Sequence, residues 1–300
     1  MDKKKDANIN SLEDKYSLVS KIGSGSFGEV YLSEYKKNKK LCAIKVEERK
    51  PSSRIHEEYR IYKKLRKNGV NQGIPLIFEY IETPKYNILV MELLGKSLDE
   101  LFVENNNLFD LTTVLKLSVE IINLLKLIHD AGFIHRDIKP NNFLVGYKEQ
   151  NNKLFIMDFG LSKQHTSNNT HINITMDRSL VGTARYASTN VHMGIEPSRR
   201  DDLESVGYML VYFLIGKLPW QGLKTKKRDG EKVSQIELIG ETKMCTNINK
   251  ICSGLPDCFS TFINYCKTLE FEQKPDYIYI NKLFYNQIKI SNIELRYIWE

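Results

Sequence analysis

The sequence predicts an α+β fold in two lobes, a small β-rich N-terminal lobe with one main helix and a larger, mostly helical C-terminal lobe. Short strand-like runs flank a Gly-rich turn between residues 16 and about 86, and long helices with wide apolar faces follow from residue 111 onward. The pattern changes near 93–96. We therefore expect lobes at 15–93 and 94–300, forming a single domain over about 16–290 that follows a loose, charged lead-in at 1–14.

The N-terminal elements are expected from the spacing of apolar residues. Residues 16–21 and 30–35 flank the glycines, an arrangement typical of a β-hairpin. Residues 41–46 and 88–93 are short apolar runs of the kind found in buried strands, and 56–67 carries apolar and aromatic residues at helical spacing. The first lobe should thus be a sheet with one main helix.

The C-terminal elements are mostly helices. Residues 111–129 present a wide apolar helical face, and Asp110 suits the N-cap position before them. A second long helix is expected from about 201 to 215, ending at Gly216, because glycine favours helix C-termini. Residues 154–157 resemble a strand, and the rest of the chain to Trp299 is expected to be helices and loops.

Composition narrows the class of protein. The 300 residues are 41% hydrophobic and 27% charged, which suits a globular protein, and no apolar run reaches the ~18 residues of a membrane span. The charged N-terminus does not resemble a secretory signal. The five cysteines lack C-x-x-C spacing, so we expect free thiols in an intracellular compartment, cytoplasm or nucleus. A monomer is the default expectation.

The run at 135–142, H-R-D-I-K-P-N-N, carries the main functional signal. Asp137 can orient a hydroxyl and accept its proton, Lys139 can neutralise charge on a transferred phosphoryl group, and Asn142 can hold a metal ion. His135 is expected to be structural, beneath this loop. These are the parts of a protein kinase, so the predicted architecture is the bilobal protein-kinase fold.

Two further motifs precede that run in the order a kinase requires. Residues 23–30 read G-S-G-S-F-G-E-V, a loop whose glycines let backbone amides approach phosphate oxygens. Lys45 ends a C-A-I-K run on the third strand and is expected to hold the α- and β-phosphates and to pair with a helix glutamate. Glu58 is preferred because Tyr62 follows one turn later on the same face, and Glu57 is the alternative.

A third motif follows. Asp158, Phe159 and Gly160 form D-F-G after the strand at 154–157. Asp158 is expected to hold a Mg²⁺ that bridges the ATP phosphates, and Asn142 the second Mg²⁺. Oxygen ligands suit this ion, which also uses substrate phosphates as ligands. ATP and Mg²⁺ are the expected cofactors.

Four other runs identify a family. G-T-A-R-Y-A-S at 182–188 stands where most protein kinases carry A-P-E, and the runs at 198–208, 218–224 and 274–277 go with it. Together they resemble the casein kinase I family over about 16–284, more closely than the related vaccinia-related kinases. The resemblance implies a Ser/Thr protein kinase that prefers acidic or already phosphorylated protein substrates and needs no phosphate on its activation loop.

The resemblance also implies roles for single residues. Met91 should control the depth of the adenine pocket, while Glu92 and Leu94 offer backbone hydrogen bonds to adenine. Asp202 should tie the catalytic loop to the second long helix. The residues expected to bind the nucleotide are Ile22, Gly23, Gly25, Ser26, Gly28, Val30, Ala43, Lys45, Met91, Glu92, Leu94 and Leu144.

Basic residues are expected at the substrate face. Arginine can clamp a phosphoserine or a carboxylate, and Arg185, Lys224, Arg178 and Lys232 are the expected substrate-anion residues. The lysine that completes this site stays open among 226, 227, 228 (an arginine) and 232. The 226–228 cluster by itself would also fit a localisation signal or a nucleic-acid patch.

Other functions receive less support. The net charge of +7 suits an acidic protein substrate as well as nucleic acid, which is not expected as the primary partner because surface charges are screened beyond about 8 Å. A pseudokinase scaffold would lack one of the catalytic residues, and all are present. A small-molecule kinase does not need the Lys139-Pro140 pair or the long segment at 163–188.

Overall fold

The computed structural model of the chain describes residues 12, 14–25, 28–167, 170–224, 227–228 and 231–300. It divides into two compact units. Unit 1 is the chain up to Gly95 together with Leu144–Gly160, and unit 2 is Lys96–Phe143 together with Leu161–Glu300. The first break lies close to the expected lobe boundary. Residues 144–160, which the sequence places in the second lobe, pack with unit 1, where the amide of Ile156 donates to the carbonyl of Gly73 (2.8 Å).

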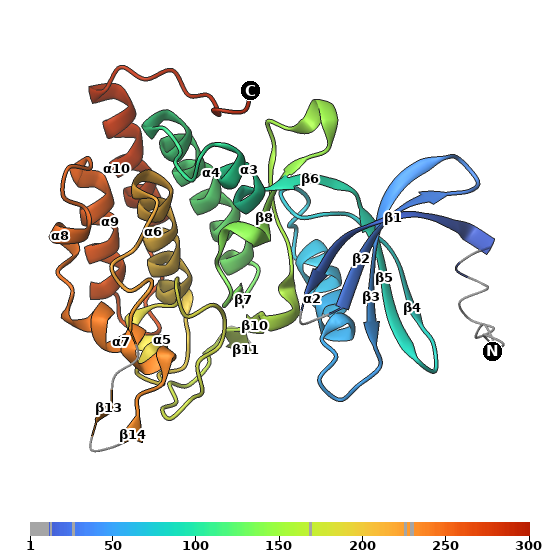
Figure 1. The fold of residues 1–300 in the computed structure, drawn as a ribbon, viewed down its shortest axis with the longest axis horizontal. Helices are drawn as coiled ribbons and strands as arrows, with labels where there is room; N and C mark the ends of the chain where they lie inside the picture. The colour runs from blue at the N-terminus through green and yellow to red at the C-terminus, as the bar shows by residue number, and fades with distance from the viewer. Residues whose placement is uncertain (1–11, 13, 26–27, 168–169, 225–226, 229–230) are drawn as a thin grey trace. The chain divides into compact units, whose positions relative to one another are not determined.

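The main sheet belongs to unit 1 and has five antiparallel strands in the order β1-β2-β3-β5-β4 (Figure 1). The strands are β1 (Tyr16–Gly25), β2 (Gly28–Tyr35), β3 (Lys40–Glu48), β4 (Ile77–Glu82) and β5 (Tyr86–Glu92). The helix α2 (Ile55–Lys67) packs against β4 and β5. The strands and the helix expected from the sequence are confirmed, with ends that differ by a few residues.

The two faces of this sheet carry different side chains, because successive residues of a strand point to opposite faces. Val30 is the cross-strand partner of Lys45, and Ala43 is the partner of Met91. These four residues therefore share one face of the sheet. The register places the expected phosphate-binding lysine and three other residues expected to bind the nucleotide on the same surface.

The opposite face is closed by a hydrophobic cluster that reaches into the N-terminal lead-in. Leu12 is only 4% exposed and packs with Tyr16 and with strand residues of β3 and β5. The lead-in is therefore anchored at Leu12 rather than loose at this position, because burial removes its side chain from water. The other lead-in residues up to position 11, and residue 13, lie outside the described part of the chain.

Unit 2 is built around long helices (Figure 1). The helix α4 (Leu111–Asp130) begins after Asp110, whose Oδ1 accepts a hydrogen bond from the amide of Thr113 (2.8 Å). The helix α6 (Arg199–Ile215) ends at Gly216, which has a left-handed φ of 74°. The N-cap and the C-terminal glycine predicted from the sequence are thus confirmed. α6 packs against α4 and α9, and α10 packs against α4 and α9.

The remaining helices are α3 (Leu98–Glu104), α5 (Thr189–His192), α7 (Gln235–Cys245), α8 (Ile248–Ile251), α9 (Asp257–Thr268) and α10 (Tyr277–Ile290), with 3₁₀ turns at Pro140–Asn142, Lys148–Gln150 and Phe159–Leu161. The short strands are β6 (Leu94–Ser97), β7 (Phe133–Ile134), β8 (Phe143–Gly146), β9 (Leu154–Ile156), β10 (Lys163–Gln164), β11 (Thr166–Ser167), β12 (Thr170–His171), β13 (Lys227–Arg228) and β14 (Glu231–Lys232). β6, β8 and β9 form one sheet, and β10 pairs with β7.

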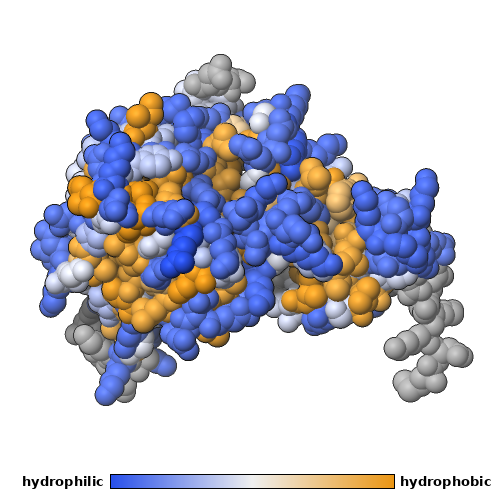
Figure 2. Space-filling view, turned by 90° about the horizontal axis from the view of Figure 1, so that it is seen from above, coloured by the Kyte–Doolittle hydropathy of each residue, from blue (hydrophilic) through white to orange (hydrophobic). Residues whose placement is uncertain are grey.

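The surface is mixed in polarity. Figure 2 shows hydrophobic residues reaching the surface in several places between hydrophilic ones. Among the residues that the structure describes, Ile278 and Ile290 of α10 are the most exposed large hydrophobic ones, at 79% and 80%. Scattered apolar exposure of this kind is ordinary in folded proteins. Within the described residues, no helix combines the length and the apolar character needed to cross a membrane.

Candidate active site

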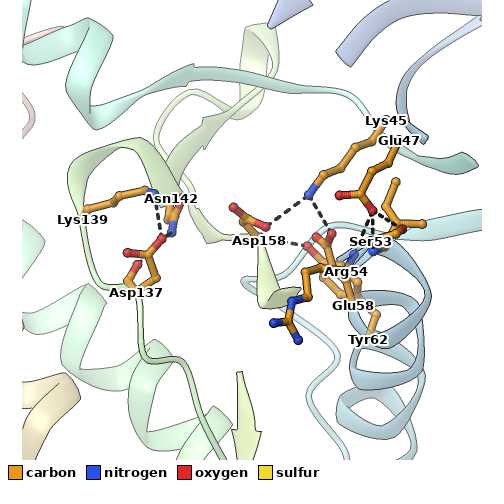
Figure 3. A network of polar contacts seen from close by, with 11 residues as sticks. Lys45, Glu47, Ser53, Arg54, Glu58, Tyr62, Asp137, Lys139, Asn142 and Asp158 are labelled. Atoms are coloured by element: carbon orange, nitrogen blue, oxygen red, sulfur yellow. Dashed lines mark hydrogen bonds and ion pairs between the residues drawn. The ribbon is translucent and has the colours of Figure 1, made fainter. Parts of the chain in front are cut away.

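The functional residues of unit 1 centre on a buried lysine (Figure 3). Lys45 on β3 is 8% exposed, and its Nζ lies 2.7 Å from Glu58 Oε2 and 3.1 Å from Asp158 Oδ1. Burial alone would lower the pKa of Lys45, but the two carboxylates outweigh it and the pKa is raised. Lys45 is therefore a fixed positive charge. Its side chain joins β3, α2 and the segment that carries Asp158.

The pairing decides between the two glutamates of α2. Glu58 is fully buried and bonds to Lys45, whereas Glu57 is exposed and pairs with Arg60 (3.1 Å). The helical period explains the difference, because adjacent residues point about 100° apart around a helix axis. Glu58, the preferred residue of the sequence analysis, is the partner of Lys45.

Two further contacts fix α2 against the rest of unit 1. Glu47 on β3 accepts hydrogen bonds from the amides of Arg54 (2.8 Å) and Ile55 (3.1 Å), where the free amides of a helix N-terminus favour a negative charge. Tyr62 accepts a hydrogen bond from the amide of Asp158 (3.3 Å), and its ring meets that of Phe159 edge to face at 5.0 Å. The position of Glu58 is thus set by contacts on both sides of it.

Gly28 of the Gly-rich loop is required by the packing of the strands, apart from any contact with a ligand. Gly28 has φ of 121°, and a β-carbon there would lie 2.2 Å from the carbonyl oxygen of Val46. Only glycine fits this approach of β2 to β3. Gly23 and Gly25 lie on β1 opposite β2. Ser26 lies outside the described residues.

The expected adenine-binding residues all belong to unit 1. Met91 and Ala43 pair across β5 and β3, and Met91 is 3% exposed. The amide of Glu92 donates to the carbonyl of Leu76 (2.8 Å), so that amide is already bonded within the protein. The others are Leu94 on β6 and Leu144 on β8, both half-buried, and Ile22 on β1, which is 50% exposed.

Unit 2 carries the residues expected to act on a hydroxyl group (Figure 3). Asp137 is 4% exposed, and its Oδ2 accepts hydrogen bonds from Lys139 Nζ (2.7 Å) and Asn142 Nδ2 (3.3 Å). Its Oδ1 accepts one from the hydroxyl of Thr183 (2.8 Å). Lys139, Asn142 and Thr183 therefore hold the carboxylate of Asp137 in one orientation.

The loop that carries Asp137 is held from α6. Asp202 is buried, and its two carboxylate oxygens accept hydrogen bonds from the amides of His135 (2.7 Å) and Arg136 (2.8 Å). Burial would raise the pKa of Asp202, but hydrogen bonds from His129 and the His135 amide outweigh it and lower the pKa. Asp202 is thus ionised, and it supports Arg136 in a left-handed conformation (φ 67°) that non-glycine residues rarely adopt.

A second segment of unit 2 approaches the same loop. Gly182 has φ of 87°, and a β-carbon there would lie 2.3 Å from the carbonyl oxygen of Arg136. This close approach brings Thr183 to Asp137. Arg185 follows two residues later, with its guanidinium 5.7 Å from the Tyr186 ring centroid and 5.5 Å from that of Tyr212.

A family model for the protein kinase domain matches residues 16–276. The chain belongs to the protein kinase family. The β-rich unit with its Gly-rich loop and the helical unit with its H-R-D loop are the two parts of this domain.

The family implies ATP as a substrate and typically a divalent metal ion, and each of the two units has an oxygen donor that suits such an ion. Asp158 offers a carboxylate from unit 1 that is 22% exposed. Asn142 uses its amide nitrogen to bond the carbonyl of Asp137 (2.8 Å), which leaves its amide oxygen to coordinate a metal. Both donors are of the kind that Mg²⁺ prefers, and the ion would supply positive charge beside the phosphates.

The four expected substrate-anion residues differ in their surroundings. Arg185 is half-buried against two tyrosine rings, and Lys224 and Lys232 are exposed. Arg178 contacts groups of its own segment, with its Nε 2.9 Å from Thr175 Oγ1 and 3.2 Å from a carboxylate oxygen of Glu196. Lys226 lies outside the described residues, and nothing of the side chains at 227 and 228 is described.

Two residues of the kinase were missed by the sequence analysis. Glu196 is 3% exposed and lies within 4 Å of three cations, Lys163 (2.9 Å), Arg178 (3.2 Å) and Arg136 (3.9 Å). Lys243 of α7 is 2% exposed and donates to two backbone carbonyls beside Arg185. Neither residue lies in a motif, so no local signal in the sequence could have revealed them.

Proposed function

We propose that this protein kinase transfers the γ-phosphate of ATP, in the presence of Mg²⁺, to serine or threonine of acidic or already phosphorylated proteins, as casein kinase I enzymes do. The proposal includes constitutive activity. It rests on the resemblance of the runs at 182–188 and 198–208 to that family and on the contacts of Asp137, Arg185 and Glu196. Free thiols at all five cysteines suit the reducing compartment we propose, cytoplasm or nucleus.

The roles of the residues follow from the requirements of phosphoryl transfer, which needs positioning and charge neutralisation more than covalent chemistry. Lys45 would hold the α- and β-phosphates, with its own orientation fixed by Glu58. Asp137 would orient the attacking hydroxyl and accept its proton. Lys139, already hydrogen-bonded to Asp137, would neutralise charge on the phosphoryl group.

One observation carries the choice of substrate. Thr183 bonds to Asp137, and Arg185 follows it by two residues with its guanidinium against the rings of Tyr186 and Tyr212. Aromatic contacts restrain an arginine and keep the N–H donors of its planar guanidinium pointing in one direction. A restrained arginine so close in sequence to the contact with the proton acceptor suits the reading of an anionic group on the same peptide.

Constitutive activity is supported by Glu196. Many kinases need a phosphate on the activation segment, which we define as residues 161–196, to neutralise the arginine of H-R-D. A buried carboxylate near Arg136 that also bonds to Lys163 and Arg178 supplies a negative charge without modification. Phosphatase treatment should therefore leave the activity unchanged, and its loss would refute constitutive activity.

Transfer of labelled γ-phosphate from Mg-ATP tests the proposal. The substrates are casein and four matched peptides, one acidic, one with a phosphoserine, one neutral and one basic. Asp137→Ala should abolish transfer. Arg185→Gln should lower kcat/KM for the acidic and phosphorylated peptides by about tenfold or more, the worth of one charge-assisted hydrogen bond. Arg60→Gln, which removes an exposed arginine of α2, is the matched control and should leave kcat/KM unchanged for both the acidic and the phosphorylated peptide.

The outcomes separate the alternatives. Preference for the basic peptide would keep the kinase activity but refute the assignment of Arg185. Transfer to tyrosine in place of serine or threonine would refute the Ser/Thr assignment. ATP binding with no transfer to any substrate would favour a pseudokinase scaffold.

A further inference from the structure

A buried lysine lies behind the segment that carries Arg185. Lys243 of α7 is among the largest fully buried side chains of the described residues. Its Nζ lies 4.9 Å from the ring centroid of Trp220 and 5.1 Å from that of Tyr208. A lysine is almost never fully buried unless other groups compensate its charge. The position of Lys243 therefore needs an explanation.

The compensation comes from backbone carbonyls. Lys243 Nζ donates hydrogen bonds to the carbonyl oxygens of Ala184 (2.8 Å) and Ala187 (2.5 Å). Burial lowers the pKa of Lys243 to about 7 although Glu204 acts in the opposite direction. The amine thus loses its hydration and gains hydrogen bonds to two carbonyls, which lie on either side of Arg185 and Tyr186 in the chain. This is a large cost for a purely structural bond, because an apolar residue of similar volume could fill the space.

Two other side chains hold the same four residues. The indole Nε1 of Trp220 donates to the carbonyl of Arg185 (2.7 Å). The ring of His192 on α5 lies 3.1 Å from the Ala184 carbonyl through Nε2, which must be the donor because a carbonyl can only accept. The backbone carbonyls of Ala184, Arg185 and Ala187 are therefore each bound by a buried side chain.

We infer that Lys243 is a specificity-determining positioning residue, which fixes the segment 184–187 so that Arg185 reads an anionic group on the substrate peptide. The inference rests on the proposed preference for acidic or phosphorylated substrates. Lys243 is too buried to touch the peptide itself and acts through the backbone of that segment. The contact between Thr183 and Asp137 does not involve Lys243, so basal transfer to a neutral peptide is independent of it.

The test compares kcat/KM on an acidic peptide with kcat/KM on a matched neutral peptide. Lys243→Met has an unbranched side chain one atom shorter than that of lysine, and it removes the donors. It should lower kcat/KM for the acidic peptide by about tenfold, mainly through KM, because a small misplacement of a binding group is costly. The neutral peptide should change by less than about twofold. A merely structural role would lower both values together.

A second variant covers the case in which Lys243→Met does not fold. Trp220→Phe keeps an aromatic ring, smaller than the indole, and removes the donor to the Arg185 carbonyl; it should give the same selective loss. Lys116→Met is the matched control. Lys116 is also largely covered and lies 3.7 Å from the Tyr297 ring centroid, far along the chain from the segment, and its loss should leave the ratio unchanged.

The two proposals fail in different ways. A wild-type enzyme with no preference for the acidic peptide would refute the proposed substrate class. A wild-type preference that Arg185→Gln abolishes, but that Lys243→Met and Trp220→Phe both retain, would refute the role of Lys243 and leave the substrate class intact.

Discussion

Glu196→Gln should loosen the activation segment by removing the negative charge that holds it. The Glu196 side chain is 4% exposed and lies 2.9 Å from Lys163, 3.2 Å from Arg178 and 3.9 Å from Arg136. One such pair at 4 Å is worth about 4 kcal/mol before desolvation, at an effective dielectric constant of about 20. Removing one partner of a buried ion pair costs about 3–5 kcal/mol.

The loss of stability expected for Glu196→Gln is smaller than about 3–5 kcal/mol, because two of the three cations are partly exposed to water. The side chains of Lys163 and Arg178 are 35% and 52% exposed, so solvent can compensate part of their lost partner. We expect a loss of about 2–3 kcal/mol in the free energy of unfolding. We also expect a fall of about tenfold in kcat, because Arg136 adjoins Asp137 in the catalytic loop.

Urea denaturation and steady-state kinetics of the full chain measure both quantities. Glu104→Gln is the control, since it removes an exposed carboxylate that pairs with Lys96 and should cost less than about 1 kcal/mol. A Glu196→Gln enzyme with the wild-type unfolding midpoint and the wild-type kcat would refute the view that this carboxylate replaces an activating phosphate.

The pH dependence gives a second check on Glu196. Burial alone would raise its pKa, but the hydrogen bond and charge of Lys163 outweigh burial and lower the pKa below 4.5. A carboxyl group whose pKa is lowered by folding contributes its full stabilisation at pH values above its pKa in the unfolded chain. That stabilisation is lost as the pH falls through the lower pKa of the folded chain. The stabilities of the wild type and of Glu196→Gln should therefore differ most above pH 4.5 and converge below it.

Three further predictions concern single residues. Glu58→Gln should lower kcat/KM for ATP by about tenfold or more, since it removes the buried partner of Lys45, whereas Glu57→Gln should leave it unchanged; steady-state kinetics in ATP measure both. Gly182→Ala should cost at least about 2 kcal/mol in thermal unfolding, because its φ of 87° and a backbone oxygen 2.3 Å from the added carbon both oppose a side chain. Burial lowers the pKa of His165 to about 4, so between pH 6.5 and 4 the unfolded chain binds a proton that the folded chain does not. The free energy of unfolding of the wild type should therefore decrease as the pH falls from 6.5 to 4, and it should decrease less steeply in His165→Gln.

The catalytic residues could be predicted from the sequence because phosphoryl transfer requires particular groups in a particular order. Lys45, Asp137 and Asp158 each stand in a short motif whose neighbours also bear on the reaction. The choice of Glu58 over Glu57 needed only the period of a helix. Strands and helices followed from apolar spacing, which reflects the burial of one face. Apolar spacing does not show which unit the segment 144–160 joins, because strand pairing decides that.

The residues that the sequence analysis missed have roles that exist only in the folded chain. Glu196 bonds to Lys163 across 33 residues, and Lys243 bonds to the Ala184 carbonyl across 59. In the sequence each resembles an ordinary charged surface residue. Leu12 was missed for a similar reason, since one apolar residue in a charged lead-in has no periodicity to indicate its burial.

The contacts of Glu196 and Lys243 have a joint consequence for the activation segment. Glu196 anchors it through side chains at 163 and 178, and Lys243 anchors it through the backbone at 184 and 187. Both anchors are ionisable groups of the chain itself, and both are almost fully buried. Buried charges respond weakly to salt because solvent ions cannot approach them. High salt should therefore weaken the reading of an anionic peptide by Arg185, which is half-buried, while kcat on a neutral peptide persists. This result would separate the partly exposed charge that selects substrates from the buried groups that hold the segment.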